Sequence, residues 1–126
     1  MGIVHHPRYL VYFEIARTRY MRDLGLPYAR LIASGTHLAV IEVDVRYLRP
    51  ARYDEELAVV TRCVEAGRTR IALEYEVRRG DDVLATGRTR LASVNPAGRP
   101  VRLPADVREV LSRECGGDGA GGGAGA

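Results

Sequence analysis

The fold is decided by residues 2–9, which read GIVHHPRY, together with residues 12–17, which read YFEIAR. Pro7 stands where a helix can begin, because a proline in the first turn has no N–H to leave unpaired. From about Pro7 to Leu24 apolar side chains recur at spacings of three and four, the period of an amphipathic helix, and Gly25 can end it. The apolar positions are Tyr9, Tyr12, Phe13, Ile15, Ala16, Tyr20, Met21 and Leu24. The stretch therefore predicts a specialised turn that leads into one long helix with a wide apolar side.

Four strand-like runs follow, after a connection that allows a helical turn beyond Pro27. They cover residues 41–47, 57–64, 71–77 and 83–94. In the first run Ile41, Val43, Val45 and Tyr47 alternate with charged residues, which predicts a sheet with one buried face. The turn signal at residues 80–82 joins the last two runs as a hairpin, and if this pairs symmetrically about Asp81, Glu74 faces Arg88. A helix followed by antiparallel strands predicts the α+β class.

The length of 126 residues and the hydrophobic share of 46% indicate one domain, which we place at residues 1–114. Pro104 to Arg113 should form a short terminal helix with Asp106 in its first turn. Residues 115–126 are nearly all glycine and alanine after Cys115. Such a segment cannot bury enough surface to offset its ordering entropy, so a disordered tail is predicted there.

Several classes of protein are disfavoured by composition. The net charge of +3 comes from arginines that are scattered among acids, which argues against a nucleic-acid groove. No apolar run is long enough to cross a membrane and no secretory signal is visible, so a cytoplasmic protein is expected. Cys63 and Cys115 are the only cysteines and stand far apart, so the sequence implies neither a disulfide framework nor a metal site.

Residues 2–9 and the helix that follows resemble the active-site segment of hotdog-fold acyl-CoA thioesterases of the 4-hydroxybenzoyl-CoA thioesterase type. The resemblance extends from Gly2 to about Pro104. It implies a long central helix wrapped by an antiparallel sheet, and hydrolysis of an acyl or aroyl thioester of coenzyme A without a metal or other cofactor. It also implies a homodimer, or a homotetramer formed as a dimer of dimers, with active sites at the dimer interface. A non-catalytic hotdog module that binds acyl-CoA or serves in assembly is the alternative.

The family pattern begins with a strand that ends in an acidic residue three positions before the glycine that matches Gly2. In this sequence that acid would lie before Met1. Either the protein begins further upstream or this member has lost the strand. We expect the former, because a lost strand would expose ladder groups and uncover part of the helix.

His6 and Glu14 are the candidate catalytic residues. Thioester hydrolysis needs hydrogen-bond donors for the carbonyl oxygen and a base for water or a nucleophile. Backbone amides at the start of the helix, including that of His6, can serve as the donors. The His6 side chain can also transfer a proton, or it can simply bond locally at the helix start. Glu14 can act as a base or nucleophile, or pair with Arg17 three residues on.

The remaining candidates bind substrate. Gly2, Val4, His5 and Tyr9 belong to the segment that carries the resemblance, although His5 matches a variable position and can equally be a loop side chain. The resemblance also implies basic residues on late strands and turns for the phosphates of coenzyme A. For these we select Arg88, Arg90 and Arg99, while Arg88 can instead form an ion pair with Glu74.

Overall fold

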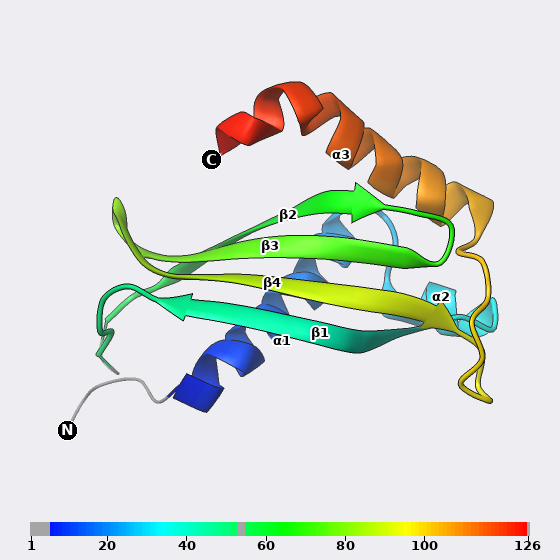
Figure 1. Cartoon of the computed structure of the whole chain (residues 1–126), viewed down its shortest axis with the longest axis horizontal. Helices are drawn as coiled ribbons and strands as arrows, with labels where there is room; N and C mark the ends of the chain where they lie inside the picture. The colour runs from blue at the N-terminus through cyan, green and yellow to red at the C-terminus, as the bar shows by residue number, and fades with distance from the viewer. Residues whose placement is uncertain (1–5, 53–54, 126) are drawn as a thin grey trace.

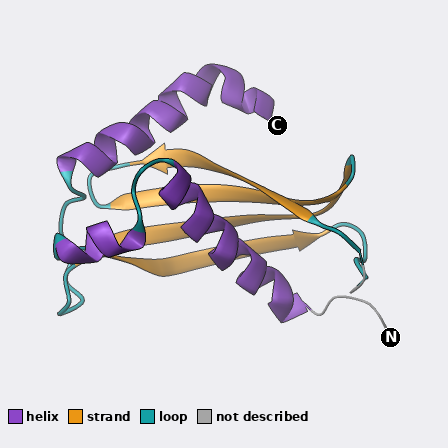
Figure 2. Ribbon diagram, turned by 180° about the vertical axis from the view of Figure 1, so that it is seen from behind, coloured by secondary structure: helices purple, strands orange, loops and turns teal. Residues whose placement is uncertain are grey.

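The computed structural model describes residues 6–52 and 55–125, with side chains described for 9–52 and 55–115. Its elements are α1 (His6–Asp23), α2 (Tyr28–Ala33), β1 (His37–Tyr47), β2 (Ala58–Ala66), β3 (Arg70–Arg79), β4 (Asp82–Val94) and α3 (Ala105–Gly125). The strands form one antiparallel sheet in the order β1-β4-β3-β2. α1 crosses one face of this sheet and α3 lies alongside the edge strand β2 (Figures 1 and 2). The predicted α+β class is confirmed, and within the described ranges no strand precedes α1.

α1 packs on the sheet through large apolar side chains. Tyr9, Phe13 and Met21 are each at most 2% exposed. The ring of Phe13 stacks on that of Tyr75 in β3, with centroids 4.6 Å apart and planes inclined by 15°. Full burial of one such side chain contributes roughly 1.5–3 kcal/mol to stability. Ile15 was predicted to extend the apolar stripe, but it is 55% exposed because it lies about 200° around the helix from Phe13.

A glycine ends α1, as the sequence predicts. Gly25 has a φ of 81°, a conformation that L side chains rarely adopt, and the N–H of Leu26 donates to the Met21 carbonyl at 2.8 Å. The short helix α2 then follows Pro27, where the sequence predicts a helical turn.

The hairpin of β3 and β4 has the predicted register. Gly80 lies in its turn with a φ of 60°, and Glu74 is the direct partner of Arg88. Because directly opposed residues share a face, this register places Glu74 and Arg88 on the same side of the sheet.

β1 is where the expected burial fails. Val43 and Val45 pair with Thr89 and Gly87 of β4, so they do share the face that α1 covers. Val43 nevertheless remains 42% exposed and Ile41 48% exposed. Val43 is exposed because β1 is an edge strand, with a neighbour on one side only. Ile41 lies where the register of β1 shifts, between Val40 and Glu42, so the predicted alternation is interrupted there.

α3 packs through Val107 and Leu111, which are at most 2% exposed. The structure continues this helix to Gly125, past the predicted end at Arg113 and through the segment predicted to be disordered. Glycine disfavours a helix by about 1 kcal/mol per residue relative to alanine, which is why the sequence indicates an earlier end. The division into a domain of residues 1–114 and a tail of 115–126 stays a prediction.

Candidate functional site

The first candidate element is the amino end of α1, which begins at His6. The N–H groups of a first helical turn have no partner within the helix and lie at the positive end of its dipole. Such a terminus can stabilise negative charge on an oxygen atom. Gly2, Val4 and His5 lie outside the described residues, as does the side chain of His6. Their assignments as site residues stay predictions.

Glu14 lies about two helical turns beyond His6, and its side chain is exposed. Among the side chains that the structure describes, Glu14 has no ion-pair partner, so the pairing with Arg17 that the sequence allows is not formed. Arg17 lies instead near the hydroxyl of Tyr75. The Glu14 carboxylate is therefore available to a ligand.

Glu14 borders a groove between α1 and β1, which we call the α1–β1 groove. Its volume is about 240 Å³, and its walls are mostly apolar. The lining residues are Leu10, Val11, Phe13, Glu14, Arg17, Val40, Val43 and Thr89. A hollow with apolar walls and a few polar groups suits a small ligand that carries both apolar and polar parts.

A buried polar pair lies beside this groove. The hydroxyls of Tyr75 and Thr89 are 2.8 Å apart, and both residues are at most 4% exposed. Burial raises the pKa of Tyr75, and the hydrogen bond with Thr89 and the charge of Arg17 partly offset that rise. The phenol therefore stays neutral and able to share its proton with Thr89.

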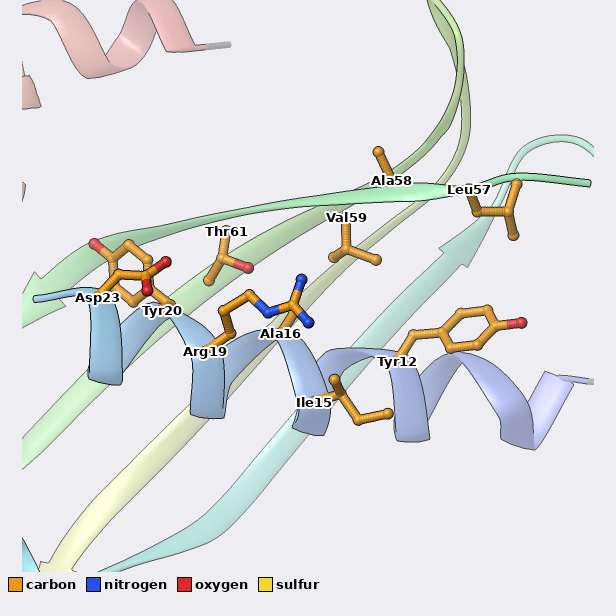
Figure 3. A pocket seen from close by; sticks show the side chains of 10 residues that line it. All are labelled: Tyr12, Ile15, Ala16, Arg19, Tyr20, Asp23, Leu57, Ala58, Val59 and Thr61. Atoms are coloured by element: carbon orange, nitrogen blue, oxygen red, sulfur yellow. The ribbon is translucent and has the colours of Figure 1, made fainter. Parts of the chain in front are cut away.

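A second hollow, the α1–β2 groove, lies on the other side of α1 and measures about 490 Å³. Figure 3 shows Tyr12, Arg19 and Tyr20 of α1 on one side of it, with Val59 and Thr61 of β2 opposite. Among the predicted site residues whose side chains the structure describes, none lines this groove. Glu14 borders the α1–β1 groove and also a hollow of about 450 Å³ along α1, and its assignment to the site stays a prediction.

Tyr9 lies in an aromatic cluster. It is 2% exposed, its ring centroid is 5.7 Å from that of Tyr12, and it is 5.3 Å from that of Tyr47 in β1. Burial, together with neighbouring Tyr12, raises the pKa of Tyr9. This placement gives Tyr9 a packing role under the start of α1, and its role in substrate binding stays a prediction.

Arg88 and Arg90 lie on the sheet face away from Glu14. Gly87 faces Phe13 of α1, so the alternation of a strand turns Arg88 to the opposite side. Arg90 forms ion pairs with Glu42 at 2.9 Å and Glu65 at 3.9 Å on that side.

Unlike Arg90, Arg88 and Arg99 form no ion pair with a described side chain, and they lie in different surroundings. Glu74 pairs with Arg62 at 2.8 Å, whereas Arg88 forms no ion pair with a described residue and its Nε is buried without a hydrogen-bond partner. Arg99 is exposed in the turn after β4, where its N–H donates to Asn95 Oδ1 at 3.0 Å. Within one chain, the three arginines are therefore not gathered around Glu14.

Two further observations concern the described ranges alone. They hold no group of three or more His, Cys, Asp or Glu side chains that is arranged to bind a metal ion. No helix in them is long and apolar enough to cross a membrane.

Sequence reasoning missed the pair Tyr75 and Thr89 and the contact between Cys63 and Cys115, whose Sγ atoms are 3.2 Å apart. Tyr75 and Thr89 belong to runs of alternating residues, so the sequence could have predicted which face of the sheet their side chains lie on. No sequence signal connects two cysteines that are 52 positions apart.

Comparisons with known proteins find similar sequences and a similar fold. A family profile described as the thioesterase superfamily matches residues 1–86. A putative esterase of Aquifex aeolicus is 33% identical over 110 residues, covering 87% of this chain and 85% of that protein. The acyl-CoA thioesterase YbgC of Haemophilus influenzae is 30% identical over 112 residues, covering 87% and 82%. The structure of a DHNA-CoA thioesterase from Staphylococcus aureus is similar with a TM-score of 0.89 and 28% identity, covering 96% and 85%.

Proposed function

Because this chain belongs to the thioesterase superfamily and is a thioester hydrolase with the hotdog fold, we propose that its substrate is an acyl or aroyl thioester of coenzyme A. Water would add to the thioester carbonyl, and the products would be a free acid and the thiol of coenzyme A. The observation that carries this proposal is the exposed Glu14 carboxylate at the border of the apolar α1–β1 groove. The names of the relatives support the same class of substrate.

The proposed mechanism uses the amino end of α1. Unpaired backbone N–H groups there, including that of His6, would donate hydrogen bonds to the carbonyl oxygen as it gains charge. Glu14 or the His6 imidazole would accept a proton from the attacking water. Either route completes hydrolysis without a metal ion.

The coenzyme would be held by arginines. A guanidinium group binds phosphate with paired hydrogen bonds, and the Nε of Arg88 has no partner in the described structure. Arg90 would have to exchange its contacts with Glu42 and Glu65 for a phosphate. Because these side chains lie across the sheet from Glu14, the nucleotide would pass around a sheet edge or reach a second copy of the chain.

We also propose that the active form is a symmetric homodimer joined through β1. This strand is an edge of the sheet, and it carries exposed apolar side chains beside others on α1. They are Leu10, Val11, Val40, Ile41 and Val43. Four residues of this set, all except Ile41, also line the α1–β1 groove, so the partner would close the groove. A tetramer built from two dimers and a cytoplasmic location belong to the same proposal.

The test is turnover of a panel of acyl- and aroyl-CoA thioesters by the purified protein, followed through the loss of thioester absorbance. The variants His6→Ala and Glu14→Gln are each compared with a matched control, which is His37→Ala in β1 for the histidine and Glu109→Gln in α3 for the glutamate. Loss of a general base lowers kcat by about 10²–10⁴-fold. The controls should retain full activity.

The outcomes separate the parts of the proposal. If thioesters are hydrolysed but neither change at the site lowers the rate, the residue assignment is wrong and the function stands. If acyl-CoA binds but no member of the panel is hydrolysed, the protein is a binding or assembly module instead.

A further inference from the structure

The two cysteines meet although they are far apart in sequence. Cys63 lies in β2 and Cys115 in α3, no disulfide bond joins them, and their Sγ atoms are 3.2 Å apart. Cys63 is 1% exposed, whereas Cys115 is half-buried. The pair therefore has one member within the core and one that small molecules in solvent can reach.

Side chains from three elements hold this pair in position. The Cys63 N–H donates to the Tyr20 hydroxyl of α1 at 3.0 Å, and that hydroxyl donates to Glu114 of α3 at 3.3 Å. The Cys63 thiol is also 3.4 Å from the Glu65 carbonyl, at the point where the register of β2 shifts. Because Glu114 precedes Cys115 directly, Tyr20 links the backbone of one cysteine to the neighbour of the other.

We propose that Cys63 and Cys115 form a dithiol site, which a low-molecular-weight disulfide oxidises to an intramolecular disulfide bond between β2 and α3. The Cys115 thiolate attacks one sulfur of the small disulfide and displaces one thiolate. The Cys63 thiolate then attacks Cys115 Sγ and displaces the second thiolate. The protons of the two cysteines leave with two small thiol molecules, so the protein loses two electrons and the small disulfide gains them.

The environment of each thiol sets the order of these steps. Burial raises the pKa of the Cys63 thiol, and the neighbouring Cys115 thiol adds to that rise. Cys63 is therefore mainly a neutral thiol, and the more accessible Cys115 reacts first. Closing the bond from 3.2 Å to about 2.0 Å needs a movement of about 1 Å, which rotation of the two side chains can supply.

The bond would fasten the middle of α3 to the sheet. α3 contacts the rest of the described chain mainly through β2, and Tyr20 lines the α1–β2 groove at the same place (Figures 1 and 3). Oxidation would therefore fix one wall of that groove together with the terminal helix. This link is independent of the thioesterase reaction, because none of the proposed catalytic residues takes part in it.

The test uses the whole protein in buffers with graded ratios of reduced to oxidised glutathione, in the folded state and unfolded in urea. After the remaining thiols are alkylated, mass spectrometry measures the fraction that has lost two hydrogens and identifies the Cys63–Cys115 cross-linked peptide. We expect the folded chain to form the bond at a ratio of reduced to oxidised glutathione that is at least about tenfold higher than the ratio at which the unfolded chain forms it. The reason is that a disulfide bond that stabilises the fold is itself stabilised by the fold to the same extent. The thermal midpoint of the oxidised protein should also rise by a few degrees.

Cys115→Ser is the matched control, since it removes only the half-buried thiol. It should form no bond, and its thermal midpoint should not respond to oxidised glutathione. The proposal is overturned if the folded wild type stops at a mixed disulfide on Cys115, links two chains together, or forms the internal bond no more readily than the unfolded chain.

Discussion

Phe13 of α1 occupies the space that a side chain at position 87 of β4 would need. A Cβ atom placed on Gly87 would collide with Cε2 and Cζ of the Phe13 ring and lie 3.2 Å from Cδ2. The same ring stacks on Tyr75, so it is held from both sides. The distance between helix and sheet therefore depends on a missing side chain.

Gly87→Ala should lower the free energy of unfolding by roughly 1–3 kcal/mol, the usual cost of overpacking a core. Urea unfolding measures this value. Gly67→Ala is the control, because its nearest foreign atom, the Arg70 carbonyl oxygen, is 3.4 Å away. Adding Phe13→Leu to Gly87→Ala should recover part of the loss. An alanine at position 87 that unfolds like the wild type would contradict the contact.

Tyr75→Phe should destabilise the protein by about 1–3 kcal/mol, because Thr89 would keep a buried hydroxyl without its partner. Thr89→Val should have a comparable effect for the same reason. The double variant should cost clearly less than the two single changes added together, since it leaves neither group unpaired. Additive values in urea unfolding would show that the hydrogen bond contributes nothing.

Val43→Glu should prevent association through β1 and lower acyl-CoA turnover about tenfold or more, because it places a charge in the proposed apolar interface. Sedimentation measures the mass of the assembly. Val60→Glu in β2 is matched to it, since Val60 is 47% exposed and Val43 42%. The control should behave as the wild type. If the Val43→Glu variant sediments with the same mass as the wild-type assembly, the interface lies elsewhere.

The protein should lose stability at high pH. Burial is the largest cause that raises the pKa of each of Tyr9, Tyr20 and Tyr75 in the folded state. A group whose folded pKa is raised stabilises fully below its unfolded pKa, about 10 for tyrosine, and this contribution is lost as pH rises through the folded pKa. Unfolding and tyrosinate absorbance should therefore change together above about pH 10. Ionisation of all seven tyrosines with the fold intact would contradict this.

Local signals explain what the sequence predicted well. α1 was expected from Pro7 to Leu24 and runs from His6 to Asp23, because apolar spacing and a closing glycine are encoded within the helix itself. The hairpin register, with Glu74 opposite Arg88, follows from a turn of known position.

What the sequence could not predict depends on how distant elements meet. Tyr75 and Thr89 form a pair beneath Phe13 only after β3 and β4 align and α1 docks. The exposure of Val43 follows from the edge position of β1, which strand order decides. Arg88 and Glu14 were grouped by chemistry, and only the side that Gly87 presents to α1 shows that they lie on opposite faces.

The order of elements along the chain has a consequence for synthesis. α1 is translated before every strand on which it packs, and 71 residues separate its end at Asp23 from the end of β4 at Val94. At about 5–20 residues per second, a ribosome needs about 4–14 seconds to complete them. During that interval the ring of Phe13 has no complete sheet to cover it, so α1 waits for its packing partner. Until β4 is complete, the apolar face of α1 is therefore open to aggregation and to chaperone binding.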